Sequence, residues 1–337
     1  PRKSWLRLLP DDDATHNELS GQAMRPDLQR AFIDRVTPDR YEKFKADLYG
    51  WLGFPIEFRV CEMPVFVSHT FRRALEEAAI DIVRQCIEPS VLAHTQSTLE
   101  PSNTVPHEAK RPLFSVVDFA VCKNDEGAFV PKLIELQGFP SLLGYQYVYG
   151  KRMQETYGLD GTPMMGGLGD NAYLEMLKET LFAGHDPAQC ALIEVDPTNQ
   201  KTRSDFRALE LLIGLQTLDI RSLIKKDRVL YYERDGVHVP LRRVFNRAIV
   251  DELEEKGVTL PFAWTDDLDT EWAGHPNWYF RISKAVMPWL RHAAVEIPCS
   301  PPLMRCTADC LAPSPYRWCA ECRDAEPDGE GRATDAI

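Results

Sequence analysis

Three polar side chains that could hold a cation or an amide occur in two short segments rich in β-forming residues. The segments are LFSVVDFAVC at 113–122 and AFVPKLIELQ at 128–137, and KNDEG separates them. A Gly at the end of such a linker is typical of a hairpin turn, so we expect the segments to pair as antiparallel strands. The three side chains are Asp118, Glu135 and Gln137.

The register of this hairpin decides how near the two carboxylates lie. With the turn centred on Asp125 and Glu126, Leu133 is expected opposite Asp118, and Glu135 one pair further along the same face. The two carboxylates then become diagonal neighbours, about 7 to 8 Å apart at the backbone. A shift of one residue would move these side chains to opposite faces of the hairpin.

Two interpretations of this hairpin face are open. Charged strand residues commonly lie on the solvent-exposed face of an amphipathic hairpin. Here, however, Phe114 and Leu133 are expected on the same face, and the chain continues into the apolar stretch GFPSLLGY. These surroundings favour a pocket in which the carboxylates bind the ammonium or amide group of a substrate.

The most regular block of the sequence predicts a βαβ unit. A strand at 190–195, a helix at 203–213 that ends at Gly214, and a strand at 215–220 follow one another directly. Because strands that alternate with helices are typical of parallel sheets, residues 184–260 are expected to contain a parallel, Rossmann-like sheet. The block lacks both G-x-G-x-x-G and G-x-x-x-x-G-K-[ST], so it carries neither the dinucleotide fingerprint nor a P-loop.

The polar segment DPTNQKTRSD, residues 196–205, follows the first strand of this unit, at the sheet edge where open α/β sheets bind ligands. Thr198 or Asn199 can cap the following helix. Lys201 and Arg203 would add positive charge beside the free N–H groups of that helix, which suits an anion. A capped helix with solvated Lys and Arg side chains explains the same residues equally well.

Two later segments gather further polar and basic side chains. RRVFNRAI at 242–249 places Asn246 and Arg247 side by side, and GHPNWYFRISK at 274–284 contains Arg281 and Lys284 among aromatic residues. One interpretation assigns Asn246 and Arg247 to a substrate, and Arg281 and Lys284 to an anion. The other is a loop that is packed by its aromatic side chains.

These elements place the chain in the α/β class. A mainly helical N-terminal region, a β-hairpin substrate region with a helix, a Rossmann-like domain and an irregular tail rich in Cys and Pro follow one another. The corresponding ranges are 1–110, 111–183, 184–290 and 291–337.

Composition and charge limit the partners. Of 337 residues, 39 are Lys or Arg and 51 are Asp or Glu, and the net charge of −12 argues against nucleic acid as a partner. All apolar runs are shorter than the roughly 18 to 20 residues of a membrane-spanning helix, so no membrane partner is expected. The initial PRKSWLRLLPDDD lacks the pattern of a signal peptide, and we expect a cytoplasmic protein.

The tail differs in composition from the rest of the chain. From residue 296 onward it is rich in Pro, Cys and Arg and has almost no apolar periodicity. Four of its cysteines could bind zinc as thiolates, although their spacing is unlike that of zinc ribbons. They are Cys306, Cys310, Cys319 and Cys322.

Three stretches together resemble the front half of ATP-grasp ligases, the superfamily of glutathione synthetase and the glutathionylspermidine-synthase-like enzymes. DFAVCKNDEGAFVPKLIELQ resembles the substrate-domain hairpin of these enzymes. LIEVDPTNQKTRSDFRALELLIGLQTLDI, with the later RRVFNR, is similar to their pre-ATP-grasp domain. HPNWYFRISKAVMPWLRHAAVEIP is similar to the linker before the ATP-grasp domain, so the resemblance covers residues 110–298.

The resemblance implies an ATP-dependent carboxylate–amine ligase that uses ATP and Mg²⁺ and forms an acyl phosphate. It implies that Asp118, Glu135 and Gln137 lie in the site of a small-molecule amine or peptide-like substrate, and that Arg247 and Lys284 lie near a cleft between domains. The family's Lys strand, Gly-rich lid and acidic-x-Asn metal motif do not follow residue 298, so we expect this form to be inactive. A shifted reading frame or a truncation near residue 295 would explain this departure and the unusual tail.

Two further classes of function are consistent with the sequence. A non-catalytic protein could bind an anionic small-molecule metabolite through the hairpin and the Rossmann-like unit. A zinc-dependent module could instead use the cysteines of the tail as ligands, and stoichiometric zinc would support that class alone. No metal ligand is assigned elsewhere in the chain.

Overall fold

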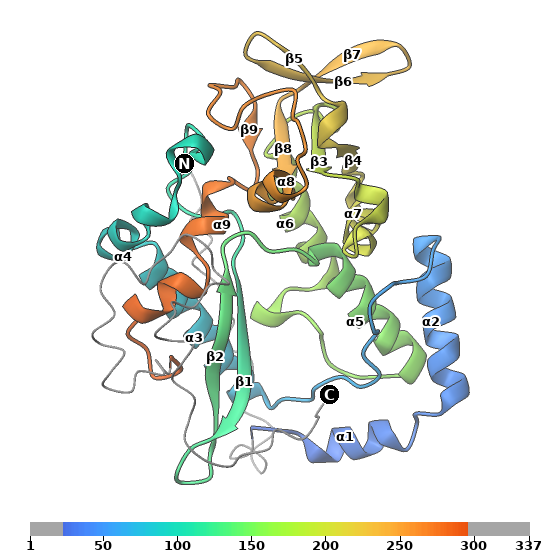
Figure 1. Cartoon of the computed structure of the whole chain (residues 1–337). Coiled ribbons are helices and arrows are strands. Elements are labelled where there is room, and N and C mark those ends of the chain that lie inside the picture. The colour runs from blue at the N-terminus through green and yellow to red at the C-terminus, as the bar shows by residue number, and fades with distance from the viewer. Residues whose placement is uncertain (1–22, 296–337) are drawn as a thin grey trace.

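The computed structural model describes residues 23–295. The expectations for the tail, both the zinc site and the shifted reading frame, fall mainly on residues 296–337 and lie outside the described residues. Figure 1 shows helices together with a parallel sheet at one end of the molecule and a long β-hairpin towards the other, which confirms the α/β class. Within 23–295, no helix is both long enough and apolar enough to cross a membrane.

The N-terminal region is helical, as predicted. Its helices are α1 (Pro26–Ile33), α2 (Pro38–Leu52), α3 (His69–Cys86) and α4 (Pro89–His94). α2 begins where the Thr37 hydroxyl accepts a hydrogen bond from the Arg40 N–H, and it ends at Gly53, whose φ of 88° is in the left-handed region. α3 buries Ala78 and Ile82, four residues apart and therefore on one face of the helix.

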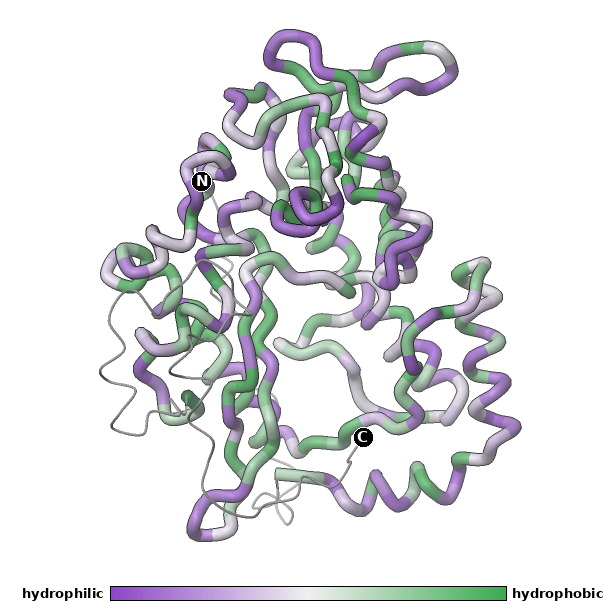
Figure 2. The backbone as a smooth tube through the Cα atoms, in the orientation of Figure 1, coloured by the Kyte–Doolittle hydropathy of each residue, from purple (hydrophilic) through white to green (hydrophobic). Residues whose placement is uncertain are grey.

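The predicted hairpin is present as β1 (Val116–Lys123) and β2 (Phe129–Gln137), which pair antiparallel. Figure 2 shows hydrophobic and hydrophilic positions alternating along these two strands. The apolar stretch after β2 leads into a helix that the sequence analysis did not predict, α5 (Leu143–Tyr157). Tyr145, Val148 and Met153 of α5 are buried in one core with the N-terminal helices.

The predicted βαβ unit is confirmed, and it belongs to a larger sheet. The strands of this sheet are β3 (Cys190–Glu194), β4 (Gln216–Asp219), β8 (Arg243–Asn246) and β9 (Glu271–Trp272). They lie in the order β4-β3-β8-β9, and every neighbouring pair is parallel. α7 (Arg203–Ile213) connects β3 to β4 and ends at Gly214, whose φ is 80°.

Both faces of the parallel sheet are covered, because alternate residues of β3 face opposite cores. Cys190 and Leu192 pack with α7 and with α6 (Asp170–Phe182). Ala191 and Ile193 pack with α8 (Val250–Glu255) and with a small antiparallel sheet. The strands of that small sheet are β5 (Ile224–Lys226), β6 (Val229–Arg234) and β7 (Val237–Leu241), of which β6 and β7 form a second antiparallel hairpin.

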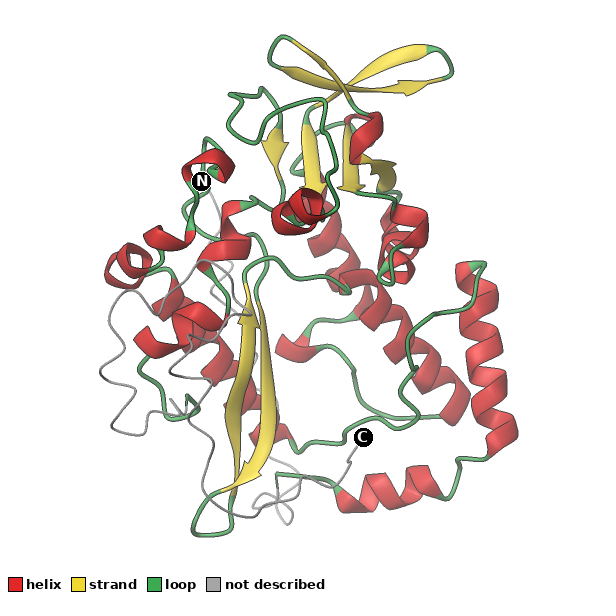
Figure 3. Ribbon diagram, viewed as in Figure 1, coloured by secondary structure: helices red, strands yellow, loops and turns green. Residues whose placement is uncertain are grey.

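The last described segment returns to the β1–β2 hairpin. It contains α9 (Asn277–Arg281) and a 3₁₀ helix at Lys284–Trp289, and Trp278, Ile282 and Val286 are buried together with Leu133 of β2. Figure 3 shows the short helices of this segment beside the long hairpin. The remaining 3₁₀ helices are Gln96–Thr98, Pro101–Asn103, Met165–Gly167, Pro187–Gln189, Pro197–Asn199 and Ile220–Ser222. The predicted domain boundaries stay a prediction.

Candidate functional site

The register of the hairpin differs from the prediction. Asp118 pairs with Glu135 rather than with Leu133, because the register shifts between Asp118 and Phe119. Phe119 pairs with Leu133, which leaves Ile134 as an extra residue on β2. This is a β-bulge, a feature that redirects the side chains on one side of it. The two carboxylates are therefore direct cross-strand partners rather than diagonal neighbours.

The bulge also changes which residues share a face. Leu133 and Glu135 would lie on one face of a regular strand, but the extra residue between them places them on opposite faces. Leu133 and Leu136 are buried in the core, whereas Ile134 is exposed and Glu135 is half-buried. The expectation that Leu133 shares the face of the carboxylates is therefore wrong, and the hydrophobic surroundings of the pair are smaller than expected.

Four of the predicted site residues meet on this hairpin face. Gln137 Nε2 donates a hydrogen bond to Glu135 Oε1 at 3.0 Å, and Lys284 Nζ lies 3.1 Å from Glu135 Oε2. Asp118 is the cross-strand partner of Glu135, and each carboxyl group affects the pKa of the other. The sequence assigned Lys284 to an anion site, but the structure places it at the carboxylate pair.

The two carboxylates have unlike environments. Burial, followed by the charge of Glu135, raises the pKa of Asp118. The hydrogen bond from Lys284 lowers the pKa of Glu135, and the hydrogen bond from Gln137 adds to this effect. When the pKa values of two neighbouring carboxyl groups differ in this way, the group with the higher pKa keeps its proton to a higher pH than its neighbour. Glu135 is thus the member of the pair that carries the charge over the wider pH range.

Gly138 explains how Lys284 reaches the hairpin. The Gly138 N–H donates to the Ile282 carbonyl oxygen at 3.0 Å. A Cβ at this position would lie 2.7 Å from the Trp278 carbonyl oxygen and 2.8 Å from Ile282 Cβ. Only glycine fits so close an approach, so the break in the pattern after Gln137 allows the segment of Lys284 to pack against β2.

A second polar cluster, buried and built around Asp205 in α7, holds the chain that leaves the hairpin. Asp205 Oδ1 accepts hydrogen bonds from the N–H groups of Gly144 at 2.7 Å and Tyr145 at 2.9 Å, and Oδ2 accepts one from Leu142 at 2.8 Å. This carboxylate caps the N-terminus of α5 from another helix. Arg247 is also buried and donates from Nη1 to the carbonyl oxygens of Phe139 and Pro140, both at 2.9 Å.

Glu194 was not identified from the sequence. It ends β3 at the point where the chain order reverses, since β4 follows on one side of β3 and β8 on the other. Its side chain is 6% exposed, and Oε1 accepts a hydrogen bond from the Val195 N–H at 2.7 Å. Burial raises the pKa of Glu194 to about 7. The signal in the sequence was a single carboxylate at the end of the buried strand CALIE.

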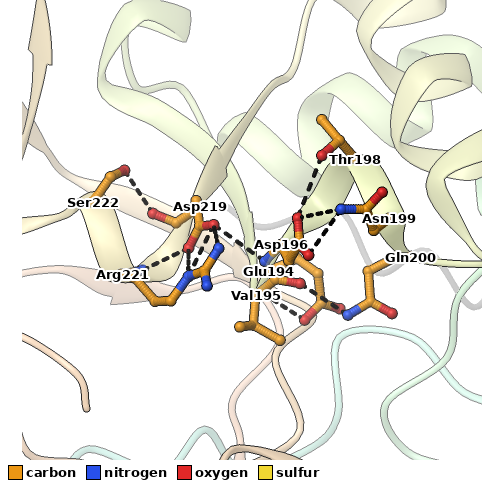
Figure 4. Close-up of polar contacts among 9 residues, drawn as sticks. All are labelled: Glu194, Val195, Asp196, Thr198, Asn199, Gln200, Asp219, Arg221 and Ser222. Atoms are coloured by element: carbon orange, nitrogen blue, oxygen red, sulfur yellow. Dashed lines mark hydrogen bonds and ion pairs between the residues drawn. The ribbon is translucent and has the colours of Figure 1, made fainter. Parts of the chain in front are cut away.

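The predicted anion site after β3 is arranged differently from the expectation. Asn199 donates to both oxygens of Asp196 at 3.0 Å, as Figure 4 shows, and it does not cap α7. Asp219 lies next to Asp196 and accepts hydrogen bonds from Arg221. Figure 4 draws three carboxyl groups, those of Glu194, Asp196 and Asp219, and the single cation of Arg221, and this excess of acidic groups does not favour an anion.

Arg203, the first residue of α7, contacts other parts of the chain. Arg203 Nη2 lies 3.0 Å from Glu57 Oε1, its Nη1 donates to the Thr198 carbonyl oxygen, and its guanidinium lies over the ring of Phe54. Lys201 is exposed. A role of Lys201 and Arg203 in binding an anion stays a prediction.

Two further predicted residues are engaged within the protein. Asn246 is fully buried, and its amide exchanges two hydrogen bonds of 3.1 Å with the backbone of Ala248. Arg281 donates from Nε to Glu108 Oε2 and from Nη2 to Gln96 Oε1, both at 2.9 Å. These contacts stabilise turns and helix packing, and ligand binding by either residue stays a prediction.

The resemblance implies Mg²⁺ and ATP, and Mg²⁺ binds to oxygen ligands such as carboxylates. Between residues 23 and 295, no group of three or more His, Cys, Asp or Glu side chains is arranged to hold a metal ion. Asp196 and Asp219, the carboxylates at the carboxyl edge of the sheet, are already engaged by Asn199 and Arg221. The use of ATP and Mg²⁺ by a full-length form stays a prediction.

The fold and the site define an α/β protein with a parallel sheet and a carboxylate pair on a separate hairpin. No family model matches the sequence, and no curated protein matches it. Among solved structures, the chain is similar to a glutathione synthetase like-effector (GSS30) from Globodera pallida in its apo form. The TM-score is 0.48, the sequence identity is 12%, and the match covers 81% of this chain and 70% of that chain.

Proposed function

We propose that this protein binds a small-molecule amine or peptide-like ligand, and that Asp118 and Glu135 receive the ligand's ammonium group. In this proposal, the hairpin is the substrate-binding portion of a protein similar to the ATP-dependent carboxylate–amine ligases that its motifs resemble. The proposal concerns binding, and it assigns no catalytic residue.

The observation that carries the proposal is the direct pairing of two carboxylates across β1 and β2. Like charges placed directly opposite each other destabilise a strand pair. Glu135 already has an ammonium group, that of Lys284, at 3.1 Å. A ligand ammonium would supply the same charge and three N–H donors to Asp118, Glu135 and Gln137 together.

The alternative of an anionic ligand has less support. Three of the cations assigned to an anion site each face a carboxylate, with Arg203 near Glu57, Arg281 at Glu108 and Lys284 at Glu135. Their charge is thus already neutralised within the chain, whereas at the hairpin two carboxyl groups, those of Asp118 and Glu135, face the one ammonium group of Lys284.

The binding of triglycine, a peptide with a free ammonium group, tests the proposal. Glu135→Gln removes the charge at nearly constant volume, so we expect its affinity for triglycine to fall at least about tenfold, because a hydrogen bond to a charged group contributes about 1.5–3 kcal/mol. Isothermal titration calorimetry on the full chain measures this change. N-Acetyltriglycine lacks the ammonium group. Its affinity for wild type should be no higher than the affinity of triglycine for Glu135→Gln.

Glu126→Gln is the matched control, because Glu126 lies exposed in the turn of the same hairpin and the substitution changes the net charge equally. It should leave the affinity for triglycine unchanged. Equal affinities of wild type and Glu135→Gln, or tight binding of the acetylated peptide, would contradict the proposal. So would a lack of binding by both triglycine and spermidine.

A further inference from the structure

We propose that Lys284 sets the selectivity of the amine site: its ammonium occupies the site when no ligand is bound, and it favours ligands that carry a carboxylate beside their ammonium. This inference rests on the proposed function. It starts from the position of Lys284 Nζ, 3.1 Å from Glu135 Oε2, where the ammonium of a ligand would also bind.

The side chain of Lys284 can leave this position while its backbone stays fixed. The side chain is 62% exposed, whereas the neighbouring Ile282 and Val286 are 1% and 0% exposed and belong to the core. Ser283 caps the 3₁₀ helix that begins at Lys284 by accepting a hydrogen bond from the Ala285 N–H. A ligand can therefore displace the ammonium by a change of side-chain rotamers alone, which takes place within nanoseconds in exposed residues.

The displaced ammonium remains beside the site, because the chain tethers it. The positive charge of Lys284 then acts on the ligand group that lies next to the ammonium of the ligand. A second ammonium is repelled there, whereas a carboxylate is attracted and can accept a hydrogen bond from Lys284. The geometry thus favours zwitterions, such as amino acids and peptides, over polyamines, which bring positive charge alone.

The preference can be measured with two probes of opposite character. Triglycine carries one ammonium and one carboxylate, and spermidine carries ammonium groups only. The Lys284→Gln variant lacks the ammonium group that competes with the ligand for Glu135 and that repels a second cation of the ligand. We expect the variant to bind spermidine two- to fivefold more tightly, as exposed ion pairs contribute up to about 1 kcal/mol. Its affinity for triglycine should stay equal or fall, so that the ratio of the two affinities shifts towards spermidine.

Lys178→Gln is the matched control. Lys178 Nζ also lies 3.1 Å from a glutamate, Glu175, and this ion pair is exposed on α6. The control substitution changes the net charge identically and should not change the ratio. Isothermal titration calorimetry of the full chain gives both affinities for wild type and both variants.

The outcomes separate the two proposals. If wild type binds triglycine through Glu135 and the ratio is unchanged in Lys284→Gln, the selectivity role of Lys284 is wrong and the amine site stands. A ratio that shifts towards triglycine contradicts that role as well. If neither probe binds wild type or Lys284→Gln, both the selectivity role and the amine site are wrong.

Discussion

Replacing Asp205 by Asn is expected to lower the free energy of unfolding by about 2–4 kcal/mol, because a buried polar group left without a partner costs about 1–3 kcal/mol and more when the group is charged. Both carboxylate oxygens accept N–H groups, from Gly144 and Tyr145 at Oδ1 and from Leu142 at Oδ2. An asparagine presents an amide nitrogen in place of one oxygen. The backbone N–H groups at that oxygen then face the NH₂ group of the asparagine, which is also a donor. Arg247 loses a nearby negative charge as well.

Urea denaturation at neutral pH measures this loss, and Asp186→Asn is its control. Asp186 is exposed and accepts a hydrogen bond from the Ala188 N–H at 2.9 Å, at the start of a 3₁₀ helix. Asparagine caps helices about as well as aspartate, so the control should change the free energy of unfolding by less than about 0.5 kcal/mol. A loss of similar size in both variants would show that Asp205 does not hold the N-terminus of α5.

The second large effect concerns Glu194 and pH. Burial raises the pKa of Glu194 from its ordinary 4.5 to about 7. The folded protein therefore binds more protons than the unfolded chain between these values, and this contribution to stability is complete below pH 4.5 and is lost as the pH rises to about 7. The difference corresponds to about 3 kcal/mol, at 1.36 kcal/mol for each pKa unit.

Glu194→Gln should remove this pH dependence. Its amide oxygen can still accept the hydrogen bond from the Val195 N–H, and its side chain never takes up a charge. Compared with wild type, the variant is expected to be more stable by up to about 3 kcal/mol at about pH 8, and similar in stability at about pH 4. Denaturation in urea across this pH range measures the effect. Glu233→Gln, on an exposed position of β6, should follow wild type throughout.

The regular elements could be predicted because local patterns specify them. The β-forming runs on either side of KNDEG predicted β1 and β2, and the apolar periodicity before Gly214 predicted α7. α5 was missed since its N-terminus is not capped by a neighbouring side chain. Its cap is Asp205, about 60 residues further along the chain, and only the tertiary fold brings the two together.

The site was predicted in part, for a similar reason. Asp118, Glu135 and Gln137 come together as expected, but the bulge at Ile134 changes their register. Such a bulge depends on how β2 packs against the core, and alternation of residue types does not reveal it. Lys284 was selected as a cation with an anionic ligand in view, and its contact with Glu135 arises from the close approach at Gly138.

A crystal structure of the protein soaked with triglycine would show where the ammonium of the peptide binds. We expect the terminal nitrogen of the peptide within hydrogen-bond distance of both Asp118 and Glu135, with Lys284 Nζ turned away from Glu135 and towards the carboxylate of the peptide. A peptide bound elsewhere, with Lys284 still paired to Glu135, would contradict this expectation.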